Sequence, residues 1–199
     1  MQPDGAGELS DAALVYRARE GDRDAFARLY IRHQAMVYRF AYSMTGSGTL
    51  AEDVVQEVFL TLMRNIQRYS PERAALSTYL YGIARNVSRA RDRKDARFVD
   101  LDATRFLSSD EDPAVALVEG ERLRALRAAI RELPIKFREV LVLCDLHEVD
   151  YAQTALILGI PVGTVRSRLF RARQHVQQHI LRADRSVSLP RVAARRVFS

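Results

Sequence analysis

Closely spaced arginines mark the segment that runs from Val165 to Arg173. If this segment is a helix, its outward positions carry guanidinium, hydroxyl, amide and aromatic side chains, namely Arg166, Ser167, Phe170, Arg171 and Gln174. A guanidinium group can donate two hydrogen bonds to guanine, and an aromatic ring can contact a thymine methyl group. These residue types favour reading base pairs in the major groove of DNA. The alternative is an ordinary solvated charged surface.

The residues before this segment predict how it is presented. Asp150 can cap a first helix, and Gln153 stands where a capping box has an amide or carboxylate. Gly159 suits the end of that helix, and Pro161 suits the start of the next. One apolar face of the second helix is formed by Val165, Leu169, Ala172 and Val176. We therefore expect a helix-turn-helix whose second helix enters the major groove.

A second polar cluster lies on a helix expected from about Leu50 to Tyr69. Its apolar positions include Val54, Val55 and Val58. The positions away from them are acidic or amide side chains, namely Glu52, Asp53, Gln56 and Glu57. An acidic face beside a hydrophobic seam can pair with a basic helical partner, although many such faces are simply solvated.

The charge of the chain points to a polyanionic partner. The 199 residues carry a net charge of +6, which favours nucleic acid without proving it. Residues 161–199 hold nine arginines and one acidic residue, whereas residues 100–121 hold seven acidic residues and one arginine. We expect two binding surfaces separated by a connector that does not bind.

Residues for catalysis or metal binding are not grouped in the sequence. Cys144 is the single cysteine, which excludes an intrachain disulfide bond. It follows the apolar periodicity, so a buried thiol is favoured over a metal ligand. The expected helices place His33, His175 and His179 far from any obvious partner cluster. Because no nucleophile with its base and no phosphate-binding glycine loop is present, we expect no enzyme activity, no metal and no cofactor.

The sequence also bears on the compartment. Its first residues lack the basic and apolar regions of a signal peptide. No apolar run approaches the roughly 20 residues that are needed to span a bilayer. We expect a soluble, cytoplasmic protein with no membrane insertion.

Apolar residues recur at helical spacing almost throughout, and no segment alternates with a period of two. We therefore expect an all-α fold of two helical domains joined by a flexible linker, the second domain containing the helix-turn-helix. The first domain is expected over 9–97, and the polar, acidic stretch 98–112 is the linker. The second domain spans 113–183 and begins at the helix start signal Asp112–Pro113. A basic tail follows over 184–199.

Three of these segments together resemble one known family. Residues 133–153 and 159–173 resemble region 4 of bacterial sigma factors of the extracytoplasmic-function (ECF) group. Residues 51–60 resemble the region 2 helix that docks on RNA polymerase, and residues 78–86 resemble the helix that reads the minus-ten element. The motifs follow the order of the family, and the resemblance covers roughly residues 9–181.

The resemblance implies a function and partners. Members of the family bind core RNA polymerase, recognise a two-part promoter and help to open the DNA. They typically serve stress or envelope signals and are often held inactive by an anti-sigma factor. In that interpretation the acidic face of Glu52, Asp53, Gln56 and Glu57 contacts the clamp helices of the largest polymerase subunit.

The same resemblance assigns the promoter contacts. Tyr79 could stack on an unpaired minus-ten base, as could Tyr69 and Tyr81, and Asn86 could form a hydrogen bond to it. The alternative for Tyr79 and Tyr81 is core packing with the hydroxyl at the surface. The backbone phosphates would be held by Arg85, Arg89, Arg91, Arg93 and Lys94. Positions that read the minus-thirty-five element match Thr164, Arg166, Ser167, Phe170 and Arg171, whereas Arg168 and Arg173 suit phosphates or protein carboxylates.

The chain departs from the family at two positions. It has no tryptophan, and Tyr79 stands where many relatives carry one. Gly82 replaces a frequent arginine and either permits close packing or is simply tolerated.

Three rival functions remain. A conventional helix-turn-helix regulator would bind palindromic DNA as a dimer, yet no coiled-coil segment supplies a dimer interface. A nuclease would need a carboxylate cluster, and the acidic residues of 100–112 look like a linker. A pure interaction protein would leave the arginines of 166–173 without a purpose.

Overall fold

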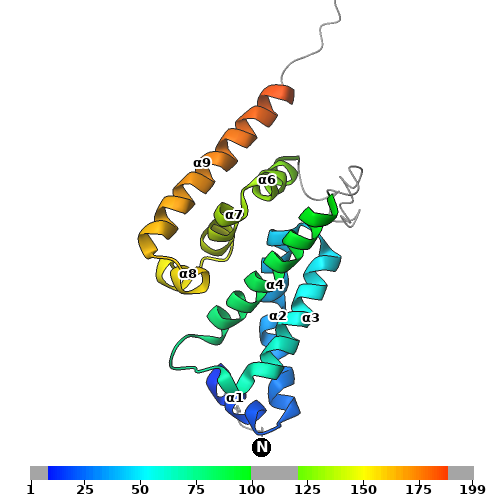
Figure 1. Cartoon of the computed structure of the whole chain (residues 1–199), viewed down its shortest axis with the longest axis vertical. Helices are drawn as coiled ribbons and strands as arrows, with labels where there is room; N and C mark the ends of the chain where they lie inside the picture. The colour runs from blue at the N-terminus through cyan, green and yellow to red at the C-terminus, as the bar shows by residue number, and fades with distance from the viewer. Residues whose placement is uncertain (1–8, 100–120, 188–199) are drawn as a thin grey trace, which may run out of the picture.

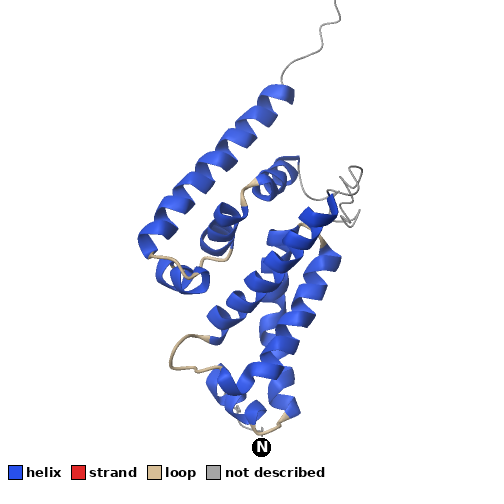
Figure 2. Cartoon of the chain, viewed as in Figure 1, coloured by secondary structure: helices blue, strands red, loops and turns tan. Residues whose placement is uncertain are grey.

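The computed structural model describes residues 9–99 and 121–187. Within these ranges every regular element is a helix (Figures 1 and 2). The expected all-α class with two helical groups is confirmed. The expected linker beyond Val99, the start signal at Asp112–Pro113 and residues 188–199 of the tail lie outside the described residues.

The first helical group contains α1 to α4 and the short turn η1. It is built from long helices, with α2 and α3 packed together and α4 lying against both. The bounds are Asp11–Arg19 for α1, Arg23–Thr45 for α2, Gly48–Asn65 for α3, Ile66–Arg68 for the 3-10 turn η1 and Leu76–Val99 for α4.

Local capping sets where these helices begin. The Asp22 carboxylate accepts a hydrogen bond from the amide of Ala25 at 3.0 Å, which starts α2. Ser10 and Ser47 cap α1 and α3 in the same way. Each such cap contributes about 1 kcal/mol, because it satisfies an amide that has no partner within the helix. Gly46 ends α2 in the left-handed conformation with φ of 73°, which glycine adopts without strain.

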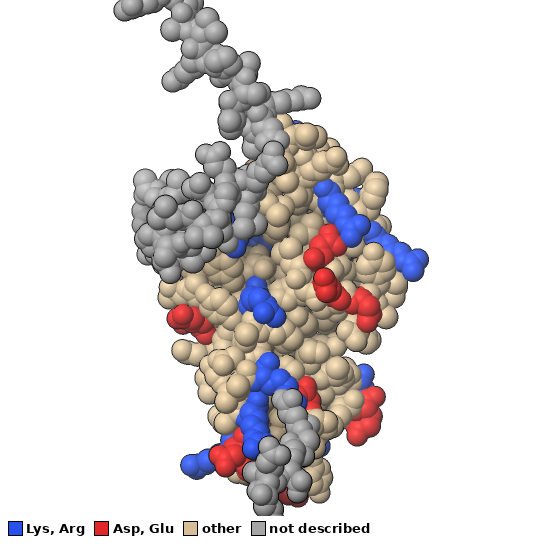
Figure 3. Space-filling view, turned by 180° about the vertical axis from the view of Figure 1, so that it is seen from behind, with Lys and Arg blue, Asp and Glu red and all other residues tan. Residues whose placement is uncertain are grey.

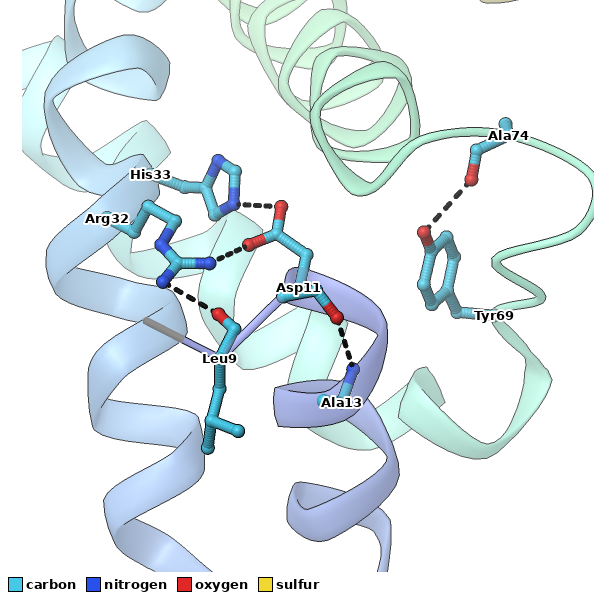
Figure 4. Close-up of polar contacts among 8 residues, drawn as sticks. Leu9, Asp11, Ala13, Arg32, His33, Tyr69 and Ala74 are labelled. Carbon is cyan, nitrogen blue, oxygen red and sulfur yellow. Dashed lines mark hydrogen bonds and ion pairs between the residues drawn. The ribbon is translucent and has the colours of Figure 1, made fainter. Parts of the chain in front are cut away.

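A polar cluster fixes α1 onto α2 (Figure 4). Asp11 accepts hydrogen bonds from Arg32 at 2.6 Å and His33 at 2.7 Å, and Arg32 also donates to the carbonyl of Leu9. The expectation that His33 has no partner cluster is therefore wrong, because Asp11 comes from a different helix 22 residues earlier. The contact is structural: it ties the first turn of α1 to the middle of α2.

The second helical group contains α6 to α9. Its bounds are Glu121–Glu132 for α6, Ile135–Leu141 for α7, Val142–Leu146 for the π-helical turn η2, Tyr151–Leu158 for α8 and Val162–Val187 for α9. Here α7 continues directly into η2, and α9 packs against α6, α7 and α8.

The two groups pack against one another (Figure 1). α4 contacts α8, while α2 contacts α6 and η2. Apolar side chains of both groups belong to one buried cluster, which includes Leu29, Phe40, Leu80, Val140 and Leu169. Burying a leucine or phenylalanine side chain contributes about 1.5–3 kcal/mol, so this shared cluster stabilises the packing of the helices within the groups and between them.

Replacing either of two glycines of the first group by alanine is expected to change stability in opposite directions. A Cβ atom at Gly82, inside α4, meets nothing within 4 Å, so close packing does not explain this glycine. We expect Gly82→Ala to raise the free energy of unfolding by about 0.5–1 kcal/mol, because alanine loses less backbone entropy in a helix. Chemical denaturation followed by circular dichroism measures this.

Gly46→Ala is the matched control. A Cβ atom there would lie 2.5 Å from Cδ of Arg131, and φ is positive. We expect this variant to be less stable than the wild type. A destabilised Gly82→Ala protein would show that Gly82 has a packing role after all.

Candidate nucleic-acid interface

The helix-turn-helix forms as the sequence predicts. Asp150 caps α8 by accepting a hydrogen bond from the amide of Gln153 at 2.8 Å. Gly159 ends α8 with φ of 64°, and α9 begins three residues later at Val162. The expected apolar face of α9 is buried, with Val165, Leu169, Ala172 and Val176 all below a tenth exposed.

The opposite face of α9 is open to solvent. Arg166, Ser167, Phe170 and Arg171 are exposed, while Thr164 is half-buried. Phe170 leaves 62% of its surface exposed, so its ring is accessible to a partner. The guanidinium of Arg166 lies over the ring of Tyr151 at 5.9 Å. This cation–π contact orients one of the expected base-reading arginines.

Arg173, on the same helix, has a protein partner. Its guanidinium donates to both oxygens of Asp145, at 2.9 and 2.7 Å. These hydrogen bonds raise the pKa of Arg173. Of the two roles expected for this arginine, the structure shows the pairing with a carboxylate, which ties α9 to η2.

The residues expected to contact the minus-ten strand are arranged along α4. Asn86 is exposed, and Tyr79 is half-buried with its ring 5.1 Å from that of Tyr69. Arg85 and Arg89 point to Glu139 of α7 and form ion pairs with it at 2.9 and 3.4 Å. The side chains of Arg93 and Lys94 lie outside the described part of α4.

The tyrosines differ from one another in environment. The Tyr69 hydroxyl donates to the carbonyl of Ala74, which holds the loop before α4 (Figure 4). Tyr81 is 6% exposed, and its hydroxyl lies 3.0 Å from Nδ1 of His147. Burial raises the pKa of Tyr81 to about 12. Tyr81 is therefore packed in the core, but its hydroxyl meets His147 and does not face solvent as the core-packing alternative expected. Of the three tyrosines, Tyr79 is the half-buried one.

The acidic face of α3 is present as expected. Glu52 and Gln56 are exposed, and Glu57 is half-buried. Asp53 forms an ion pair with Arg91 of α4 at 2.7 Å while its side chain stays 48% exposed, so Arg91 neutralises part of this face.

The sequence did not single out two exposed apolar residues that lie on the same side of α3 as the acidic face. Leu60 and Met63 lie one and two turns beyond Gln56 and are 40% and 53% exposed. The signal that could have found them was their i+4 and i+7 spacing from Gln56 on the outward face.

The described residues on one face of the molecule do not form a purely basic surface. The view from behind shows basic and acidic side chains interspersed (Figure 3).

Both helical regions of the chain match known protein families. The family described as Sigma-70 region 2 matches residues 29–98, and Sigma-70, region 4 matches residues 123–176. The ECF RNA polymerase sigma factor SigW of Bacillus subtilis is 30% identical in an alignment of 184 positions that covers 87% of this chain and 98% of SigW. The chain belongs to the ECF family of RNA polymerase sigma factors.

Two further similarities agree with this assignment. The ECF sigma factor SigE of Mycolicibacterium smegmatis is 35% identical over 75% of this chain, and the chain spans 59% of that relative's length. A solved structure of the sigma factor RpoE in complex with the anti-sigma factor NepR, from Bartonella quintana, superposes with a TM-score of 0.66. It is 26% identical and covers 80% of this chain and 98% of that one.

In this ECF sigma factor the matched ranges contain all expected site residues. The acidic face of α3 and the polar residues of α4 fall within region 2, and the outward residues of α9 fall within region 4. The structure shows that these two sets of side chains differ in how open they are to solvent. The face of α9 is open, whereas Arg85 and Arg89 of region 2 are held by Glu139 of region 4.

Cys144 of this sigma factor is half-buried, with its thiol 3.5 Å from the hydroxyl of Thr154. Burial raises the pKa of the thiol, which leaves it protonated at neutral pH. Among the described residues no group of three histidine, cysteine or carboxylate side chains is placed to hold a metal ion. None of the described helices is both long and apolar enough to cross a membrane.

The imidazole of His147 makes the packing of region 4 on region 2 sensitive to pH. Burial, and next the positive charge of Arg39, lower its pKa from 6.5 to about 4. It is also packed against Phe40 and Tyr81. A histidine that is exposed when the regions separate binds a proton near pH 6.5, so separation is favoured as the pH falls from 6.5 towards 4.

We expect the two regions to part progressively as the pH falls through this window. Energy transfer between dyes on the two regions, recorded from pH 7.5 to 4.5, measures the effect. His147→Gln should flatten the profile. An identical profile in both proteins would show that another group is responsible, and circular dichroism at each pH checks that the helices persist.

Proposed function

We propose that this sigma factor works by bridging core RNA polymerase and a two-part promoter. Residues 9–97 form region 2, residues 98–112 form the linker, residues 113–183 form region 4, and residues 184–199 form a basic tail. The single observation that carries the proposal is the open face of α9, where arginine, serine and phenylalanine side chains lie exposed beside a buried apolar stripe.

Each region has its own contacts in this proposal. Region 4 anchors on the minus-thirty-five element through Thr164, Arg166, Ser167, Phe170 and Arg171. Region 2 docks on the polymerase clamp helices through Glu52, Asp53, Gln56 and Glu57. It holds the opened minus-ten strand through Tyr79, Arg85, Asn86, Arg89 and Arg93. Because two modest contacts on one tether act at high effective concentration, neither region needs to bind a promoter tightly alone.

The remaining parts of the proposal concern partners and place. The protein carries out no catalysis of its own, since the polymerase supplies the chemistry of RNA synthesis. It acts in the bacterial cytoplasm, in a stress or envelope response. An anti-sigma factor restrains it, and support comes from the superposition with RpoE, which was solved with the anti-sigma factor NepR.

Transcription with purified core polymerase tests the function. We expect specific initiation from a cognate promoter only when the chain is added. The rival, a dimeric regulator, would instead protect a palindromic site without polymerase. A footprint of that kind, together with no initiation by the reconstituted enzyme, would overturn the proposal.

A further inference from the structure

Glu139 is the most deeply buried carboxylate among the described residues. It lies on α7 of region 4, and 1% of its surface is exposed. Its partners are Arg85 at 2.9 Å and Arg89 at 3.4 Å, both on α4 of region 2. Burying a carboxylate is costly unless a cation and hydrogen bonds compensate it, so this carboxylate depends on the other region for its charge balance.

Further polar contacts join the same two regions. Arg85 also donates to the carbonyl of Ile157 at 3.4 Å, and Arg138 donates to the carbonyl of Met44 at 2.9 Å. The Tyr81 hydroxyl meets His147 at 3.0 Å. These contacts are directional, and they join α7, η2 and α8 of region 4 to α2 and α4 of region 2, with α8 packed directly against α4.

A partly open pocket of about 320 Å³ lies where α2 of region 2 faces α6 of region 4, with Tyr38, Tyr42, Leu126 and Ile130 in its lining. Elsewhere the two regions meet through the shared apolar cluster and through the polar pairs described above. An ion pair at such an interface can be exchanged for another anionic partner when the regions separate.

We propose that region 4 of this chain is the inhibitory partner of its own minus-ten surface, with Glu139 occupying the guanidinium groups of Arg85 and Arg89 in the free protein. A carboxylate and a phosphate compete for the same donors of an arginine. Promoter strand and Glu139 therefore exclude one another at this position. The inference rests on the proposed function, because that function makes Arg85 and Arg89 strand contacts.

The closed arrangement blocks one DNA surface and spares the other. Arg85 and Arg89 are half-buried and paired with Glu139 of α7, whereas Arg166, Ser167 and Phe170 on α9 stay exposed. Free protein is thus expected to bind duplex minus-thirty-five DNA at its intrinsic affinity and single-stranded minus-ten DNA far more weakly. Opening of the two regions, as on binding to polymerase, would release the second surface.

Glu139→Gln tests the inference, because glutamine keeps the shape of the side chain and removes its charge. Asp145→Asn is the matched control: it neutralises an acidic residue of region 4 whose ion-pair partner, Arg173, belongs to the same region. Each variant is made in the full chain. Dyes on cysteines at the exposed positions Ala27 and Gln178, in a Cys144→Ser background, report the distance between the regions.

The probes are a labelled single strand that carries the non-template minus-ten sequence of a promoter and a duplex that carries its minus-thirty-five sequence. We expect Glu139→Gln to bind the single strand about ten-fold more tightly than the wild type, as when a competent state rises from about a tenth to most of the population. Energy transfer should fall, and affinity for the duplex should stay unchanged. Asp145→Asn should match the wild type for the single strand.

Unchanged single-strand affinity in Glu139→Gln would overturn the inference, whether or not energy transfer changes. His147→Gln is a second variant that weakens the interface without touching the arginines, and it should shift both signals in the same direction. Circular dichroism and duplex binding verify that each variant is folded.

Transcription by the reconstituted polymerase separates this inference from the proposed function. If the wild-type chain directs initiation and Glu139→Gln binds the single strand no better, only the masking by region 4 is wrong. If no initiation occurs with the wild type, the promoter function itself is wrong.

Discussion

Replacing Asp53 by arginine and Gln56 by alanine together should weaken binding to core polymerase about 100-fold, or roughly 3 kcal/mol. The reason is electrostatic. Both side chains lie on the acidic face of α3, and an arginine there would meet a basic partner helix with like charge. Competition binding to purified core polymerase against a labelled wild-type chain measures the loss.

Controls must account for the ion pair between Asp53 and Arg91 at 2.7 Å. Exposed pairs of this kind contribute about 0–1 kcal/mol to stability, so the double variant should remain folded. Arg91→Ala breaks the same pair without reversing the charge of α3. Glu20→Arg reverses a charge at the exposed end of α1. Core binding by the double variant at the wild-type level would remove α3 from the polymerase interface.

Removing the guanidinium of Arg171 should relax promoter specificity at one base pair of the minus-thirty-five element. We expect Arg171→Ala to lose about 1–3 kcal/mol on the cognate promoter, which corresponds to about 5- to 150-fold in affinity. The loss should shrink on a promoter altered at the base pair that Arg171 reads. Run-off transcription with the holoenzyme on matched and altered promoters measures both.

Arg182→Ala provides the comparison, since Arg182 is exposed on α9 three turns beyond Arg171 and outside the expected reading positions. A side chain that meets only phosphates lowers affinity for all sequences alike. Should Arg171→Ala reduce transcription from every promoter by one common factor, Arg171 contacts the backbone and does not read a base.

Local signals predicted much of the fold and of the outward face of α9. Asp150 caps α8 and Gly159 ends it because both effects act within a few residues of the chain. The outward face of α9 followed from the helical period alone. The assignment of individual bases and phosphates to these side chains stays a prediction.

Contacts between distant segments could not be predicted in this way. Arg85 meets Glu139 across 54 residues, and Asp53 meets Arg91 across 38. Periodicity shows that a side chain faces outward, yet it does not show which charge on another helix lies opposite. The burial of Tyr81 against His147 has the same origin, because it depends on how the two regions pack.

The π-helical turn η2 and the residue directly after it make two contacts with distant parts of the chain. Asp145, inside the turn, holds Arg173 of the recognition helix, and His147, just after it, meets Tyr81 of region 2. Each residue of a helix is rotated by about 100° from the one before it, so a chain shorter by one residue within Val142–Leu146 would turn at least one of these side chains away from its partner. In the proposed function, this turn couples promoter reading to the packing of the two regions. A change of length at this point would alter both while the side chains proposed to face DNA keep their identity.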